Sequence, residues 1–180
     1  MNIPNTLSLL RLTLIPVFIL IFFLAPDSRW FAGIIVMVSG LTDILDGHIA
    51  RKYNMITALG RVLDPLADKL TQISAFVCAA VTDLIPWWAV ILFVAKELFM
   101  LICGAIIFSR YSDVPPSNYF GKFSALFFFV ITIAIIMFPM QYAYTLAMVI
   151  AALALNYAAL AIYFVTIRVS LRKGAMKRRK

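Results

Sequence analysis

The stretch DILDGHIARKYNMITALGRVLDPLAD, residues 43–68, joins two apolar runs and is unusually acidic for its surroundings. It contains four of the eight acidic residues in the whole sequence: Asp43, Asp46, Asp64 and Asp68. The apolar runs that it joins, at residues 30–50 and 62–83, are each long enough to cross a bilayer as a helix. We therefore predict two neighbouring membrane-spanning helices that carry these carboxylates near the connection between them.

Apolar residues dominate the chain as a whole. Apolar residues make up 64% of the 180 residues and the mean hydropathy is +0.99, whereas soluble domains contain about 45–50% apolar residues. This composition excludes a soluble fold and makes the bilayer the solvent of the chain. At about 20 residues for each spanning helix, residues 1–180 form one domain. The predicted spans are residues 12–25, 30–50, 62–83, 86–109, 118–138 and 142–167.

The predicted fold class is thus all-α, a polytopic membrane bundle of six transmembrane helices. Residues 3–11 precede the first span, and Pro4, Leu7 and Leu10 suit a short N-terminal helix that lies at the membrane interface. The alternative is that the first spanning helix simply begins early.

Basic residues are distributed unevenly between the two sides of this predicted bundle. If both termini face the cytoplasm, only Arg29 lies in an outer connector. The cytoplasmic set is Arg11, Arg51, Lys52, Arg61, Arg110, Arg168, Arg172, Lys173, Lys177, Arg178, Arg179 and Lys180. This positive-inside bias predicts a multi-pass protein with both termini in the cytoplasm. It also explains most of the net charge of +8 through topology and lipid headgroups, without a nucleic-acid partner.

The spacing of the four aspartates places them in two pairs. Asp43 and Asp46 are three residues apart, and Asp64 and Asp68 are four apart, so each pair shares one face of its helix. Four carboxylates in a low-dielectric bundle repel one another unless cations neutralise them. Ligands that are all oxygen favour a hard divalent cation such as Mg²⁺ or Mn²⁺. His48 follows Asp46 by about 200° of helical rotation and is expected to point away.

Small and basic residues accompany the aspartates. Gly47 and Gly60 remove side-chain bulk where a nucleotide or diphosphate approaches the backbone, although close helix packing would need them equally. Arg51 ends the second span, where it either pairs with a diphosphate or anchors the topology.

The complete pattern resembles the signature of the CDP-alcohol phosphatidyltransferase family. The residues that carry it are Asp43, Asp46, Gly47, Ala50, Arg51, Gly60, Asp64 and Asp68. The opening IPNTLSLLR, the six spans and the short chain are also similar to bacterial phospholipid synthases. The resemblance implies a homodimeric enzyme of the bacterial cytoplasmic membrane, with its active site on the cytoplasmic side. Such an enzyme moves a phosphatidyl group from CDP-diacylglycerol to an alcohol and releases CMP.

The same resemblance assigns roles to individual residues. The four aspartates would hold two divalent cations, Mg²⁺ or Mn²⁺, and Asp68 would also serve as general base on the acceptor hydroxyl. The residues implied to line the CDP site are Thr42, Gly47, Ala50, Arg51 and Gly60.

The acceptor is less constrained. Lys96 and Glu97 are ionisable residues inside the fourth span, and with Lys122 they are the candidate acceptor-binding residues; a structural ion pair is the alternative for the first two. Family members that use glycerol 3-phosphate carry a further arginine after the acidic residue and a Lys-x-Lys-Thr stretch, where this chain has Cys103-Gly104-Ala105 and Gly121-Lys122-Phe123-Ser124. The sequence therefore favours phosphatidylglycerol as the acceptor, as in CMP-forming cardiolipin synthases, with glycerol 3-phosphate as the alternative.

Two other classes of membrane protein fit part of this sequence. A divalent-cation transporter also places aspartates in a bundle, but its ligands are expected near the middle of the membrane and with access to both faces. A non-catalytic membrane scaffold explains the hydrophobic bulk but leaves the aspartate cluster without a cause.

Overall fold

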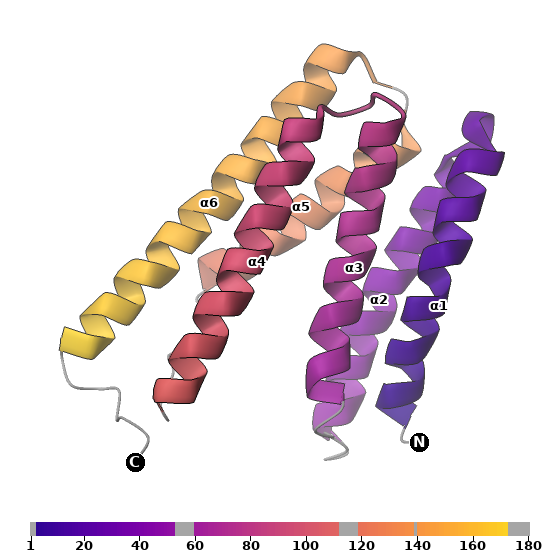
Figure 1. The fold of residues 1–180 in the computed structure, drawn as a ribbon. Helices are drawn as coiled ribbons and strands as arrows, with labels where there is room; N and C mark the ends of the chain where they lie inside the picture. Colours follow the sequence, from indigo (N-terminus) through magenta and orange to yellow (C-terminus); the bar gives the residue numbers. More distant parts are fainter. Residues whose placement is uncertain (1–2, 53–59, 112–118, 139, 173–180) are drawn as a thin grey trace. The chain divides into compact units, whose positions relative to one another are not determined.

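The computed structural model covers residues 1–180 and describes residues 3–52, 60–111, 119–138 and 140–172, with side chains described for 9–42, 66–107, 109–111, 119–138 and 140–171. Within these residues the chain forms six α-helices, confirming the all-α class (Figure 1). They are α1 Ile3–Leu24, α2 Trp30–Lys52, α3 Gly60–Val81, α4 Trp87–Arg110, α5 Tyr119–Met137 and α6 Tyr142–Arg172. The 3-10 helix η1, Pro26–Ser28, precedes α2.

The helix boundaries follow the predicted spans closely, with one difference at the N-terminus. Residues 3–11 are continuous with the first span, so α1 begins early and, among the residues that the structure describes, forms one helix with the stretch predicted to lie at the interface. Pro16 lies inside α1 and lacks the backbone N–H that an interior helical residue donates. Membrane helices tolerate such a proline because neighbouring helices and local adjustments satisfy the freed carbonyl.

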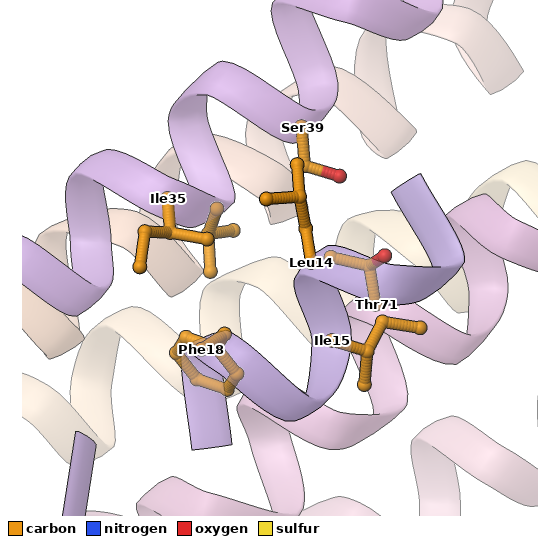
Figure 2. A pocket seen from close by; sticks show the side chains of 7 residues that line it. Leu14, Ile15, Phe18, Ile35, Ser39 and Thr71 are labelled. Carbon is orange, nitrogen blue, oxygen red and sulfur yellow. The ribbon is translucent and has the colours of Figure 1, made fainter. Parts of the chain in front are cut away.

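The chain divides into two compact units, and the first consists of Met1–Pro86 together with Thr132–Thr145. Its core is built around α1, which packs against both α2 and α3. Phe18 and Phe22 of α1 are 1% and 0% exposed. Figure 2 shows how the three helices meet: Leu14, Ile15 and Phe18 of α1, Ile35, Val36 and Ser39 of α2 and Thr71 of α3 line one small apolar gap.

Arg11 is the notable exception in this core. The sequence placed Arg11 among the basic residues of the cytoplasmic side, and the structure shows that its side chain is only 1% exposed. It precedes Leu14 and Ile15 by one helical turn, so it lies next to the layer drawn in Figure 2, on the side of the α1 N-terminus. Arg11 is therefore a cation built into the first unit.

The end of α3 is closed by a hydrogen-bonded cap. Asp83 adopts a positive φ of 57°. Its N–H donates to the carbonyl of Ala80 at 3.1 Å, and the N–H of Leu84 donates to that of Ala79 at 2.9 Å. This pair of bonds is the Schellman pattern, which satisfies carbonyls that the helix end leaves open. The cap therefore ends α3 just before the connector that leads to α4.

The second unit consists of Trp87–Ile131 and Leu146–Lys180. The rings of Phe93 in α4 and Phe128 in α5 stack with centroids 4.2 Å apart and an interplanar angle of 10°. The hydroxyl of Tyr157 in α6 donates to the backbone carbonyl of Leu92 in α4 at 2.9 Å. These contacts tie α5 and α6 to the same turn of α4.

Three of the described helical segments are long and apolar enough to cross a membrane: Trp87–Ile107, Tyr119–Met137 and Tyr142–Leu171. The apolar stretches Leu9–Leu24 and Trp30–Thr42 are shorter. Many large apolar side chains lie on the outside of these helices, among them Leu101 at 63% and Val165 at 60% exposure. Such surfaces are costly in water and natural in lipid, which makes this a membrane protein.

A close contact at Gly33 yields a prediction about packing. A Cβ placed on Gly33 of α2 would overlap Cγ of Met137, with Sδ of the same residue at 3.0 Å. A Cβ on Gly104 of α4 would meet nothing within 4 Å. We expect Gly33→Ala to lower the thermal unfolding temperature in detergent, because overpacking costs about 1–3 kcal/mol. Gly104→Ala should leave it unchanged or raise it, because alanine is the better helix former.

The double variant Gly33→Ala/Met137→Ala separates packing from other effects. Shortening Met137 makes room for the new methyl group, so the second substitution should cost less in the Gly33→Ala background than in the wild type. Equal unfolding temperatures for Gly33→Ala and Gly104→Ala would contradict the contact.

Candidate functional site

The helices α2 and α3 carry all four aspartates of the acidic stretch. α2 remains helical through Lys52 and so includes Asp43 and Asp46, and α3 begins at Gly60 and includes Asp64 and Asp68. The two helices belong to one compact unit and contact each other. The backbone is therefore helical at both pairs of aspartates, as the sequence analysis assumed. The side chains of Asp43, Asp46 and Asp64 lie outside the described residues.

Asp68 is the aspartate whose surroundings are visible. Its Oδ1 accepts a hydrogen bond from Nε2 of Gln72, one turn further along α3, at 3.0 Å. Its Oδ2 lies 3.7 Å from Nζ of Lys69. The Asp68 side chain is 33% exposed, whereas Gln72 as a residue is 6% exposed. A buried amide thus holds one carboxylate oxygen and leaves the other beside a cation.

Gln72 is a site residue that the sequence analysis missed. The signal was available, since Gln72 is a polar residue inside the third predicted span and follows Asp68 by four positions on the same helical face. It was overlooked because the aspartate pattern ends at Asp68.

The residues expected around the CDP group are visible only in part. Thr42 lies on α2, where its hydroxyl donates to the carbonyl of Val38 at 2.7 Å. The oxygen of that hydroxyl keeps lone pairs that can accept a further hydrogen bond. Gly47, Ala50 and Arg51 follow it on α2 and Gly60 opens α3, but the side-chain surroundings of these four residues and of His48 lie outside the described part.

The donor set can be judged for its fit to a divalent metal. Among the side chains that the structure describes, no three His, Cys, Asp or Glu groups come together. Asp68 supplies the described part of the set, and its carboxylate is partly exposed and accessible to a ligand. Four carboxylates on two contacting helices present hard oxygen donors of the kind that Mg²⁺ and Mn²⁺ prefer. The residues present fit such a metal.

A second polar group lies in the other unit, on α4. Nζ of Lys96 lies 2.7 Å from Oε1 of Glu97, and both side chains are only 11% exposed. The pair is at the middle of the 21-residue apolar segment Trp87–Ile107. Ionisable groups at such a depth are costly and commonly functional.

Asn156 of α6 completes this group and was also missed. Its Oδ1 accepts from Nζ of Lys96 at 3.1 Å. Its Nδ2 donates to the carbonyl of Ala152 at 3.1 Å and, over a longer 3.4 Å, to that of Ser124 in α5. Asn156 is 3% exposed, so the network of Lys96, Glu97 and Asn156 is enclosed by protein. The isolated Asn in the apolar sixth span was the available signal.

Lys122 does not join this network. Its Nζ lies 5.9 Å from the ring centroid of Tyr119, and its side chain is exposed. Ser124, two residues further along α5, is buried and therefore lies on another side of the helix. Of the three predicted acceptor-binding residues, the structure brings together Lys96 and Glu97 but not Lys122.

Fold and site together define a class: a helical membrane protein with paired aspartates on two contacting helices. The family model for CDP-alcohol phosphatidyltransferases matches residues 1–168. The chain belongs to the CDP-alcohol phosphatidyltransferase family.

Its relatives carry two different enzyme names. The chain is 36% identical to a Streptomyces coelicolor cardiolipin synthase (CMP-forming) over 127 residues, which are 68% of this chain and 59% of the relative. It is 32% identical to a Bacillus subtilis CDP-diacylglycerol–glycerol-3-phosphate 3-phosphatidyltransferase over 134 residues, 67% of this chain and 69% of the relative. The matched part thus covers about three fifths of the Streptomyces protein.

The Lys96–Glu97 pair gives a prediction about the thermal stability of the protein, which can be tested without an activity assay. Lys96→Met leaves the Glu97 carboxylate without its ammonium partner at 11% exposure. Breaking a buried pair from one side costs about 3–5 kcal/mol. We expect a marked fall in the thermal unfolding temperature in detergent, and a partial recovery in Lys96→Met/Glu97→Gln because the stranded charge is gone.

Lys122→Met is the matched control, since this lysine is exposed and outside the network. It should unfold like the wild type. Additive effects of the two network substitutions would show that the pair is not coupled.

Proposed function

We propose that this chain transfers a phosphatidyl group from CDP-diacylglycerol to the hydroxyl of a glycerol-type acceptor, releases CMP, and depends on divalent metal. The observation that carries the proposal is the placement of four aspartates on the contacting helices α2 and α3 of a family member. This set has no structural purpose of its own, because four carboxylates in a membrane bundle repel one another.

The aspartates Asp43, Asp46, Asp64 and Asp68 are the proposed ligands of two divalent cations, Mg²⁺ or Mn²⁺. Enzymes of this family are generally dependent on divalent metal. Bound cations would neutralise the diphosphate and stabilise the leaving CMP. They would also offset the mutual repulsion of the four carboxylates.

Asp68 is the proposed general base. The acceptor hydroxyl oxygen attacks the phosphorus that bears the diacylglycerol, its proton passes to the Asp68 carboxylate, and the bond from that phosphorus to the CMP oxygen breaks. Gln72 supports this role by holding Oδ1 of Asp68 at 3.0 Å, which fixes the direction of Oδ2. Nζ of Lys69 lies 3.7 Å from Oδ2, so a cation is next to this second carboxylate oxygen.

The residues Thr42, Gly47, Ala50, Arg51 and Gly60 are the proposed lining of the CDP site. All five are helical residues of α2 or of the first turn of α3, next to the aspartates. Thr42 can accept a hydrogen bond while its own proton is engaged with Val38. Arg51 would bind the diphosphate through two parallel N–H donors.

Phosphatidylglycerol is the proposed acceptor, with Lys96 and Glu97 binding its polar group and Lys122 at the periphery. Two cations that would hold a phosphate dianion are missing here, where the chain has Cys103-Gly104-Ala105 and Gly121-Lys122-Phe123-Ser124, so that Lys122 alone remains. The Streptomyces relative carries the cardiolipin synthase name. Glycerol 3-phosphate is the alternative, and it has the Bacillus relative in its favour.

The proposed setting is the bacterial cytoplasmic membrane, with the active site and both termini on the cytoplasmic side. The distribution of arginine and lysine supports this orientation. A homodimer is the proposed assembly, on the grounds of family membership.

The deciding measurement is CMP release by purified protein supplied with CDP-diacylglycerol and Mg²⁺ or Mn²⁺. Phosphatidylglycerol and glycerol 3-phosphate are added in separate reactions, and EDTA is the control. We expect metal-dependent release with phosphatidylglycerol, and a loss of at least a hundredfold in kcat for Asp68→Asn because it removes the base. No CMP with either acceptor, from folded protein that binds metal, would point instead to cation transport.

Arg51→Ala tests the donor site. If Arg51 binds the diphosphate, its loss should raise KM for CDP-diacylglycerol about tenfold or more, since charge-assisted bonds are worth about 1.5–3 kcal/mol. Lys52→Ala, the adjacent basic residue, is the control and should change this KM little. An unchanged donor KM in both variants would make Arg51 a topological anchor.

A further inference from the structure

Gln72 is a polar side chain buried inside the third predicted span. It is only 6% exposed, and it lies one helical turn closer to the middle of α3 than Asp68 does. Burying an amide away from water costs free energy unless its polar atoms are hydrogen-bonded. Nε2 of Gln72 donates to Oδ1 of Asp68 at 3.0 Å. An ionised carboxylate only accepts hydrogen bonds, so the NH₂ end of the amide is the end that faces it.

The two oxygens of the Asp68 carboxylate have different surroundings. Oδ1 is held by the buried amide of Gln72, whereas Oδ2 lies 3.7 Å from Nζ of Lys69. The side chains of Lys69 and Asp68 are 31% and 33% exposed. A separation of 3.7 Å is longer than a hydrogen bond, and an exposed lysine is held weakly in such a pair. The contact at Oδ1 is therefore the fixed one, and Oδ2 is the oxygen that an incoming cation can reach.

The Gln72 amide has the features of a residue that orients a metal ligand. Carboxylates that bind metal ions are commonly held by hydrogen bonds from a second layer of residues. Gln72 supplies such a bond from a buried position on the same helix as Asp68. The amide is also neutral, so it holds the carboxylate without cancelling the charge that attracts a cation.

We propose that Gln72 is a positioning residue for Asp68, which fixes Oδ1 so that Oδ2 is presented to a divalent cation. This inference rests on the proposed function, in which Asp68 is a metal ligand. Lys69 and the cation then compete for Oδ2, so the two neighbours of one carboxylate have opposite effects on metal binding. In the alternative, Gln72 and Asp68 only satisfy each other as neighbours on α3, and the pair stabilises the helix without affecting binding.

Three single variants separate these roles. Gln72→Met keeps an unbranched side chain and a good helix former but removes the donor. Thr71→Val is the matched control, because it removes the hydroxyl of the adjacent buried residue, which donates to the carbonyl of Ala67 at 2.9 Å. Lys69→Met removes the cation beside Oδ2 of Asp68.

Mn²⁺ binding to detergent-solubilised protein, without any CDP-lipid, is measured from the electron paramagnetic resonance signal of the free ion. We expect Gln72→Met to raise the apparent Kd for Mn²⁺ about tenfold or more. Lys69→Met should lower it about two- to fivefold, because an exposed cation no longer competes for Oδ2. Thr71→Val should leave it unchanged. Equal Kd values for Gln72→Met and Thr71→Val would overturn the proposal.

A second background tests whether Gln72 acts through Asp68. In Asp68→Ala there is no carboxylate for the amide to hold, so adding Gln72→Met should change the apparent Kd less than about twofold. The same tenfold effect in both backgrounds would show that Gln72 acts without Asp68, and the proposal would fail. Gln72→Leu also lacks the donor and takes the place of Gln72→Met if that variant does not fold.

Binding without CDP-lipid also separates this inference from the transferase function. If the wild type and variants bind Mn²⁺ in the expected pattern yet the wild type releases no CMP, the transferase proposal fails and the positioning role of Gln72 stands. If CMP is released but Gln72→Met binds Mn²⁺ as tightly as the wild type, the positioning role fails and the transferase stands. If the wild type does not bind Mn²⁺, the positioning role fails whether or not CMP is released.

Discussion

A charge inside a helix bundle that lies in lipid has no bulk water to solvate it, so the protein or a ligand has to compensate it. The two compact units meet this constraint in different ways. The first holds the fully buried Arg11 and the four-aspartate pattern of α2 and α3. The second holds one ammonium and one carboxylate in direct contact. The kind of ligand that each unit attracts depends on the charge that these contacts leave uncompensated.

The first unit depends on α1 for its form. This helix supplies Phe18 and Phe22 to the core and packs against both α2 and α3. It therefore supports the two helices that carry the aspartates. Leu14 of α1 and Thr71 of α3 lie in the same layer. Arg11 precedes Leu14 by three residues in α1, and Asp68 precedes Thr71 by three residues in α3. By helix register, the buried guanidinium is level with Asp68, where it opposes the accumulation of negative charge.

Helix positions were largely readable from the sequence, because an apolar run of span length leaves few alternatives in a bilayer. The six helices begin and end within a few residues of the predicted spans, except that α1 starts at Ile3. The pairing of the aspartates on two helices was also predictable, since it follows from spacing alone. The burial of Arg11 was not, because a basic residue before an apolar run looks the same whether it faces headgroups or a core.

Partners that are distant in sequence were equally beyond prediction. Lys96 and Asn156 are 60 residues apart, and a single Asn in an apolar span gives no indication of which helix it contacts. Gln72 could have been paired with Asp68, because the two are one turn apart on α3. Helical periodicity thus allows contacts within one helix to be predicted from the sequence, whereas contacts between helices become known only from the tertiary structure.

The division of charge between the units agrees with the chemistry of the two proposed substrates. A diphosphate carries negative charge that must be neutralised before a nucleophile can approach its phosphorus, and an excess of carboxylates attracts the cations that do so. An acceptor hydroxyl brings no charge, and strong positive charge at its site would instead attract anionic competitors. The second unit instead places a cation and an anion in direct contact, with Nζ of Lys96 2.7 Å from Oε1 of Glu97.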